Sequence, residues 1–277
     1  MVECANGIRD TGVQFPVGPT GILQVFRMRR NQISMQPTKL IYLEDFNLLA
    51  SDAKVLQIVQ ENGKEIVIFD QTIFYPQGGG QPYDKGAIEG PSGKFLVEEV
   101  RFADGVVKHI GKFESGGFQV GESVKCLVDE ARRALHSRIH SAGHVVDMAV
   151  TTLKLDWVPG KGYHFPEGPY VEYAGKLDGW LDKEKLKIDI EDLCNKFVEE
   201  NRETKLLFMD KEKMKEVCHF VPDYIPEGKP ARVVMYGDFG VPCGGTHVSH
   251  LGDMRKMTIR KIKAEGENIR VGYGVER

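Results

Sequence analysis

The chain of 277 residues is long enough for one large domain or two ordinary ones, and its hydrophobic content of 41% and charged content of 28% are those of a soluble globular protein. No stretch approaches the roughly 18–20 consecutive apolar residues that cross a membrane, so the composition argues against a membrane-spanning class. A formal net charge of −3 gives no overall attraction to nucleic acid, and any such binding must use local basic patches.

The cysteines and the N-terminus bear on the compartment. The first residues lack the basic, apolar and small-residue order of a secretory signal. An odd number of scattered cysteines favours free thiols in a reducing compartment over a disulfide framework. We therefore expect a cytoplasmic protein. The cysteines are Cys4, Cys126, Cys194, Cys218 and Cys243.

Residues 1–37 are interpreted as an N-terminal extension, because they show no clear hydrophobic periodicity. The sequence does not determine whether this extension is ordered. Arg27, Arg29 and Arg30 are compatible with a targeting segment, but the accompanying amphipathic pattern of arginine and serine is not developed.

Residues 38–128 contain short β-branched runs that predict strands, beginning with TKLIYLED. The turn signals NGK, PSG and ADG separate later runs at the close spacing of hairpins. Several strands in fewer than a hundred residues indicate a small barrel or sandwich, which would carry the glycine run of this segment in a loop.

In residues 129–277, apolar residues recur at helical spacing in some segments and form strand-like runs in others. This mixture predicts helices packed on a mostly antiparallel sheet, and an α+β fold class for the chain. A helix is expected over 130–153, with Asp129 as its N-cap. Further helices are expected over 182–200 and 210–218. The predicted strands are KLLFM, ARVVMYG, RKMTIRKIKAEG and NIRVGYGV.

Two histidines lie four positions apart in HSAGH, within the first of these helices. Side chains at this spacing share a helix face, with Cβ atoms about 5–6 Å apart, so His140 and His144 can reach one metal ion. We expect them on the flank of the buried stripe, at a pocket rim, with the small residues between them leaving room for a bound group. His136 continues the same face one turn earlier and is a rival ligand.

A second stretch, CGGTH at 243–247, repeats the spacing with a cysteine in first place. Thiolate and imidazole are the ligands that zinc prefers. The two glycines beside the cysteine let the backbone turn tightly and approach a ligand. The alternative is a buried free cysteine and an ordinary loop histidine. Together the stretches predict one zinc site, formed by His140, His144, Cys243 and His247.

Four stretches, HSAGH, CGGTH, KGYHFPEGPYVEY at 161–173 and FYPQGGGQPYD at 74–84, resemble motifs of the editing domain of alanyl-tRNA synthetases. They occur in the same order in the stand-alone relatives of that domain, the AlaX-type alanyl-tRNA editing proteins. The resemblance covers residues 38–277 and is to the medium-length form. It implies a β-barrel domain over 38–128 and a zinc-containing editing domain over 129–277.

The resemblance also implies an activity, that of an ATP-independent aminoacyl-tRNA deacylase. Such enzymes hydrolyse the ester that joins a wrong amino acid, chiefly serine and in some members glycine, to tRNA(Ala), with one Zn²⁺ per chain. A closed set of four ligands is typical of a structural zinc, whereas a catalytic zinc keeps an open position. We therefore expect Cys243 and two histidines to bind firmly and His247 more weakly.

Other side chains are candidates for the pocket walls. Thr246 is predicted to read a serine hydroxyl, and Gln81 to help choose the substrate; a purely structural loop threonine is the alternative. The predicted contacts to substrate or tRNA are Lys161, Tyr163, His164, Gly78, Gly79, Gly80 and Arg260. For residues 161–164 the alternative is a solvated hairpin loop, and for the glycine run it is a tight turn between barrel strands. For Arg260 it is surface charge on an edge strand.

Mischarged tRNA(Ala) is the expected partner, with no membrane and no obligate protein partner. Other functions stay open at this point. The chain could be a zinc-stabilised tRNA-binding module without activity, a metal-dependent hydrolase of small esters or amides, or an editing enzyme for a different mischarged tRNA.

Overall fold

The computed structural model describes residues 36–177 and 182–276, so all but the end of the predicted extension lies outside the described residues. In the described part, no helix is both long and apolar enough to cross a membrane. The cysteines described there, Cys126, Cys194, Cys218 and Cys243, are all free thiols, as expected.

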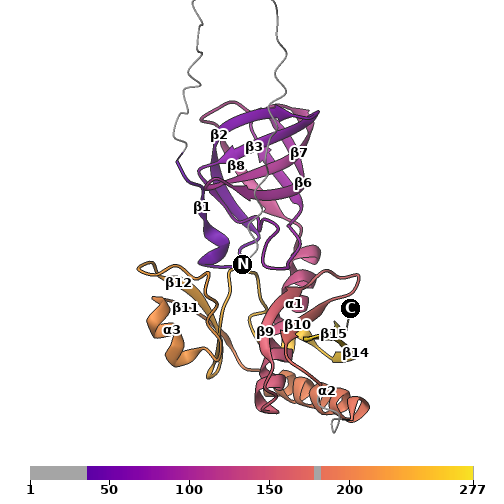
Figure 1. Ribbon diagram of the computed structural model, residues 1–277. Coiled ribbons are helices and arrows are strands. Elements are labelled where there is room, and N and C mark those ends of the chain that lie inside the picture. Colours follow the sequence, from indigo (N-terminus) through magenta and orange to yellow (C-terminus); the bar gives the residue numbers. More distant parts are fainter. Residues whose placement is uncertain (1–35, 178–181, 277) are drawn as a thin grey trace, which may run out of the picture. The chain divides into compact units, whose positions relative to one another are not determined.

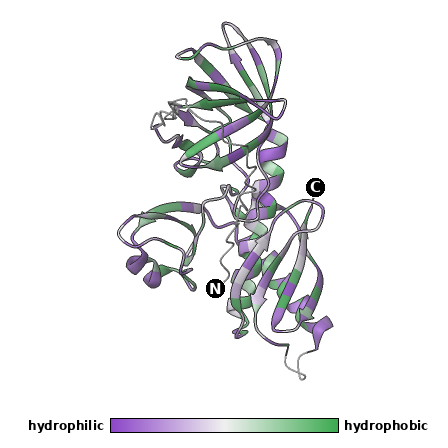
Figure 2. Ribbon diagram, turned by 45° about the horizontal axis from the view of Figure 1, so that its top comes forward, coloured by the Kyte–Doolittle hydropathy of each residue, from purple (hydrophilic) through white to green (hydrophobic). Residues whose placement is uncertain are grey.

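Six antiparallel strands close into a barrel in the first part of the described chain (Figure 1). Its hairpins form where the sequence predicts them, since Asn62 and Gly63 both adopt the positive φ of a tight turn, as do Asp104 and Gly105. Hydrophobic residues are interspersed with hydrophilic ones along these strands (Figure 2), and the apolar ones fill the interior. The predicted barrel is confirmed. In spatial order its strands are β2 (Ala50–Glu61), β3 (Lys64–Phe69), β7 (Val106–Gly116), β6 (Gly93–Ala103), β5 (Gly86–Gly90) and β8 (Ser123–Val128).

The strand predicted for TKLIYLED is wrong for most of its length. Only β1 (Lys39–Leu40) is extended, pairing in parallel with β4 (Gln71–Thr72), and a 3-10 turn, η1 (Ile41–Leu43), follows. Tyr42 in this turn is buried and packs edge-on against Tyr75, with ring centroids 5.3 Å apart. Tertiary contacts therefore override the local β propensity.

A four-stranded antiparallel sheet, with two helices that pack on it and on each other, follows the barrel. Both helices begin where predicted, because the Asp129 carboxylate accepts from Arg132 N and that of Asp182 accepts from the first turn of the second helix. The helices are α1 (Glu130–Thr152) and α2 (Lys183–Glu200). The strands, in sheet order, are β14 (Met257–Glu265), β15 (Asn268–Val275), β10 (Tyr170–Ala174) and β9 (Val158–Tyr163).

A second antiparallel sheet of three strands, with a small core of its own around Met214, carries the helix predicted over 210–218. The α+β fold class is thus confirmed, with the later strands divided between two sheets. The elements are β11 (Thr204–Met209), α3 (Lys211–Val217), β12 (Ala231–Tyr236) and β13 (Phe239–Pro242); a 3-10 turn, η2 (Leu251–Met254), precedes β14. The division into domains at residues 38 and 129 stays a prediction.

Candidate metal centre

Helix α1 presents His140 and His144 on one face, with ring centroids 5.0 Å apart. Both side chains are almost completely buried, at 2% and 7% exposure, and every residue from 139 to 146 is buried as well. The helix is therefore enclosed on all sides over this stretch. The expectation that the histidines lie at the edge of a buried stripe is wrong, because every face of the helix is buried here.

Cys243 and His247 approach these two histidines from the loop after β13. One ligand atom from each of the four side chains lies within 4.8 Å of all the others. Sγ of Cys243 is 3.4 Å from Nε2 of His140, which is close to the roughly 3.5 Å that separates ligand atoms around a tetrahedral zinc. The four predicted ligands therefore form a group that could hold a metal ion.

The hydrogen bonds of the histidines leave nitrogen atoms free for an ion. Nδ1 of His140 lies 2.7 Å from Oε1 of Gln81, and Nδ1 of His144 is 3.7 Å from the Asp147 carboxylate. The hydrogen bond to Gln81 places the proton of the His140 ring on Nδ1 and its lone pair on Nε2, the usual arrangement behind a metal ligand. Within the described residues, His144 Nε2 and both nitrogens of His247 are buried without a hydrogen-bond partner. Such orphaned atoms are rare, and a bound cation would satisfy them.

The electrostatics of three of the four side chains favour metal-binding forms, whereas a cation at this site would have to displace a proton from His144. Burial lowers the pKa of His144, but the neighbouring Cys243 and Asp147 outweigh it and raise that pKa to about 9. Burial lowers the pKa of His140 and of His247 well below the ordinary value, which keeps both rings neutral and able to ligate. Burial alone raises the pKa of Cys243, but the neighbouring His144 and Arg232 outweigh it, so the net shift is downward. A lowered thiol pKa favours the thiolate, which is the form that binds metal.

His136, the rival ligand, is buried one turn away on α1 and lies outside the group of four. The expectation that the small residues of HSAGH leave room for a bound group is wrong. Ser141 Oγ accepts a hydrogen bond from Val248 N, and a Cβ on Gly143 would lie 2.5 Å from the His164 ring. The space is used by protein. By contrast, Gly245 allows a close approach as expected, since a Cβ there would lie 2.1 Å from the His140 ring.

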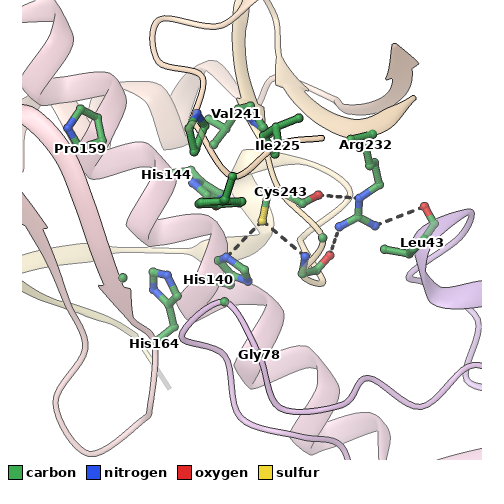
Figure 3. A pocket seen from close by; sticks show the side chains of 18 of the residues that line it. Leu43, Gly78, His140, His144, Pro159, His164, Ile225, Arg232, Val241 and Cys243 are labelled. Carbon is green, nitrogen blue, oxygen red and sulfur yellow. Dashed lines mark hydrogen bonds between the residues drawn. The ribbon is translucent and has the colours of Figure 1, made fainter. Parts of the chain in front are cut away.

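Arg232 on β12 holds the loop that carries Cys243 (Figure 3). Its buried guanidinium donates to the carbonyl oxygens of Cys243 and Gly245 on one side and to those of Tyr42 and Leu43 in η1 on the other. The metal-ligand loop is thereby fixed to the segment that precedes the barrel. The sequence gives no signal for this role, since the contacts to η1 span 189 and 190 residues.

A cavity of about 710 Å³ opens beside the ligands. Three of the four ligands, all but His247, line it, and Figure 3 shows His140, His144 and Cys243 at its wall. Of the other residues predicted from sequence, Lys161, His164, Gly78 and Gly79 line this cavity, whereas Gly80, Gln81, Tyr163, Thr246 and Arg260 do not.

Gln81 and Thr246 lie behind the ligands, both with fully buried side chains. Gln81 accepts from Thr246 N at 2.9 Å through the same Oε1 that faces His140, and its Nε2 donates to Thr246 Oγ1. Ser137 also donates to Thr246 Oγ1. The predicted catalytic roles of both residues stay predictions, and their positions favour a role in holding the ligands.

Tyr163 and Arg260 are committed to other contacts. Tyr163 stacks on Phe165 and Tyr170, with centroids 4.6 and 5.3 Å away. Arg260 donates to the carbonyl oxygens of Tyr273 and Pro169. The basic strand β14 to which Arg260 belongs is an edge strand of its sheet, in line with the alternative of surface charge on an edge.

Zinc content provides the first test of this centre. We expect the purified protein to carry one zinc ion per chain, and Cys243→Ala to lower its zinc affinity by more than about 100-fold, beyond the 10- to 100-fold typical of groups that only support a ligand. Elemental analysis and competition with a chromophoric chelator measure both quantities. His136→Asn, a change of a buried histidine on the same helix, should keep the ion. Equal loss of zinc in His136→Asn and His140→Asn would contradict the assignment of ligands.

Two comparisons with known proteins found matches, both to aminoacyl-tRNA synthetases. Residues 29–132 match the family model described as tRNA synthetases class II (A). The chain is also 32% identical over 255 residues to the alanine–tRNA ligase of Methanobrevibacter smithii. That alignment covers 89% of this chain but only 27% of the ligase, so the chain spans a minor part of its relative. The chain is therefore homologous to a region of alanyl-tRNA synthetase.

Proposed function

We propose that the chain is an aminoacyl-tRNA deacylase that hydrolyses the ester between tRNA(Ala) and a wrongly attached amino acid, serine in the first place, with glycine as the alternative. One observation carries this proposal: three of four convergent histidine and cysteine ligands line a cavity in a chain homologous to part of alanyl-tRNA synthetase. In this proposal residues 129–277 are the editing domain, residues 38–128 are the barrel domain beside it, and the protein works in the cytoplasm on charged tRNA.

The donor set fits zinc, because it combines one thiolate with three imidazoles. When bound, zinc would supply a Lewis acid that polarises the ester carbonyl. The protein residues fix the geometry around it. Gln81 orients the His140 ring, Asp147 that of His144, and Arg232 the loop of Cys243. An aminoacyl ester is already activated, so positioning of the ester and of a water molecule suffices without a covalent nucleophile.

The cavity walls support a nucleotide as the ligand. Phe102, Phe208 and Tyr224 line the cavity with exposed fractions of 51%, 52% and 80%, and unpaired bases can stack on such exposed aromatic rings. Lys161 is an exposed cation that also lines the cavity and is proposed to contact a phosphate near the tRNA 3′ end. Tyr163 and Arg260, outside the cavity, are proposed to contact the tRNA body. Thr246 and Gln81 are proposed to position the ligands.

Deacylation assays test the function directly. tRNA(Ala) is charged separately with serine, glycine and alanine and incubated with the protein, with and without a zinc chelator. Rapid loss of serine, slower or no loss of alanine, and abolition by the chelator are expected. The His136→Asn variant should act like the wild type, and Cys243→Ala should be inactive.

The alternatives give different results when a small ester and serine-charged threonine tRNA are added as substrates. Binding of tRNA(Ala) without loss of any amino acid, by folded protein containing zinc, would leave a tRNA-binding module as the better account. Hydrolysis of small esters but not of charged tRNA would indicate a different hydrolase. Removal of serine from threonine tRNA, but not from tRNA(Ala), would indicate that the enzyme edits threonine tRNA instead.

A further inference from the structure

His164 lies in a cradle made by three glycines from separate motifs. A Cβ would lie 2.5 Å from its ring at Gly143, 2.3 Å at Gly162 and 3.2 Å at Gly80. The backbone N of His164 also donates to Gly80 O at 2.9 Å. The side chain is 3% exposed. Larger residues at Gly143 and Gly162 would displace the ring directly, whereas a side chain at Gly80 would first meet the backbone of Gly162. Gly80 therefore allows its loop to approach the strand end that leads to His164.

The ring is close to the metal centre without belonging to it. It stacks on the ligand His140, with centroids 4.4 Å apart and planes inclined by 23° (Figure 3). It is not one of the four side chains whose ligand atoms converge. His164 does line the cavity, together with Gly162. His164 therefore shares the cavity lining with three of the four ligands.

The hydrogen bonds of His164 determine which nitrogen carries its proton. Its Nδ1 lies 2.6 Å from Oη of Tyr273, and that hydroxyl donates its only hydrogen to Ile139 O at 3.0 Å. The tyrosine oxygen must therefore accept, so His164 Nδ1 is the donor. Nε2 then holds a lone pair. It lies beside Gly162, where a Cβ would be only 2.3 Å away, so a side chain at position 162 would cover Nε2.

We propose that His164 Nε2 accepts a hydrogen bond from a donor on the aminoacylated ribose, either the α-ammonium group or the 2′-hydroxyl, and so orients the ester beside the ligand group. This role rests on the proposed deacylase function. It assigns Tyr273 as a positioning residue, which acts through the His164 ring. Gly143 leaves room for the ring, and Gly162 leaves Nε2 without a covering side chain.

Two substitutions separate this role from a structural one. In His164→Asn the amide nitrogen can replace Nδ1 and keep the bond to Tyr273, but no atom occupies the place of Nε2. In His164→Gln the amide oxygen can replace Nε2 as the acceptor. We expect His164→Asn to lose about 10- to 100-fold in deacylation rate and His164→Gln to retain more activity, with zinc content unchanged in both. A merely structural role predicts the opposite order.

The donor is identified with altered substrates. If the 2′-hydroxyl is the donor, tRNA ending in 2′-deoxyadenosine should show no further loss in His164→Asn. If the α-ammonium is the donor, 3-hydroxypropanoyl-tRNA, which lacks the amino group of seryl-tRNA, should show none. Nitrogen-15 NMR of zinc-loaded, histidine-labelled protein gives a readout independent of activity, with an unprotonated Nε2 expected for His164. A protonated Nε2, or wild-type rates in His164→Asn, would overturn the inference while wild-type deacylation stands. Failure of the proposed function would appear instead as wild-type protein that deacylates none of the charged tRNAs.

Discussion

Substitution of Arg133 by methionine is expected to lower the free energy of unfolding by about 3–5 kcal/mol. Arg133 on α1 and Asp84 at the end of the glycine-rich motif form an ion pair whose side chains are 4% and 0% exposed. The guanidinium donates to both carboxylate oxygens and to the carbonyl oxygens of Phe46 and Ile73. Methionine would leave a buried carboxylate without its counter-charge, and two buried carbonyl groups without their donor. Denaturant titration of the full chain measures the change.

A double-mutant cycle distinguishes this cause from simple loss of packing. Asp84→Asn combined with Arg133→Met removes the unpaired charge and should be less destabilised than Arg133→Met alone, because the largest penalty is the buried lone carboxylate. Arg138→Met is a matched control on the same helix, since its guanidinium donates to one exposed carbonyl, that of Glu276, and should cost at most about 1 kcal/mol. A value for Arg133→Met as small as that of this control would refute the argument.

The elements that could be predicted are those encoded by neighbouring residues. Asp129 and Asp182 cap the helices that follow them, and apolar residues at helical spacing continue along the length of each helix. The Asn-Gly and Asp-Gly turns likewise specify their hairpins locally. The ligand group was predictable for a similar reason, because a spacing of four on one helix places two imidazoles together before any tertiary structure is known.

Strands with weak propensity could not be predicted. β9 and β13 contain proline and glycine, which are poor strand formers, and they are extended because neighbouring strands supply their hydrogen bonds. β10 is short, and it pairs on both sides, with β9 and with β15. Tertiary contacts also explain the 3-10 turn after β1, because burial of Tyr42 against Tyr75 stabilises that backbone conformation.

The supporting contacts of the site were equally hidden. Gln81 and His140 are 59 residues apart, Arg133 and Asp84 are 49 apart, and Arg232 meets η1 across 189 residues. No local pattern marks the residues of such pairs as partners. Sequence reasoning therefore finds the ligands, whereas only the fold shows which groups hold them.

Gln81→Met is expected to lower zinc affinity by about 10- to 100-fold and the deacylation rate with it. Oε1 of Gln81 accepts from the His140 ring and from Thr246 N, so it joins a ligand on α1 to the loop that carries two more ligands. Methionine fills a similar volume but offers no comparable acceptor. His140 would then be free to rotate or to change tautomer, and its Nε2 would no longer be held toward the ion. Competition with a chromophoric chelator measures the affinity.

Gln81→Glu is the matched variant, because a carboxylate keeps both acceptor bonds and loses only the donor to Thr246 Oγ1, whose own hydroxyl can donate in return. Carboxylate behind a ligating imidazole is itself a common arrangement in zinc sites, so this variant should retain zinc near the wild-type affinity. Thermal unfolding of each variant, with and without zinc, separates metal affinity from fold stability. If Gln81→Met binds zinc as tightly as the wild type, the contact with His140 does not orient the ligand. The chemistry would then depend on α1 and the CGGTH loop alone.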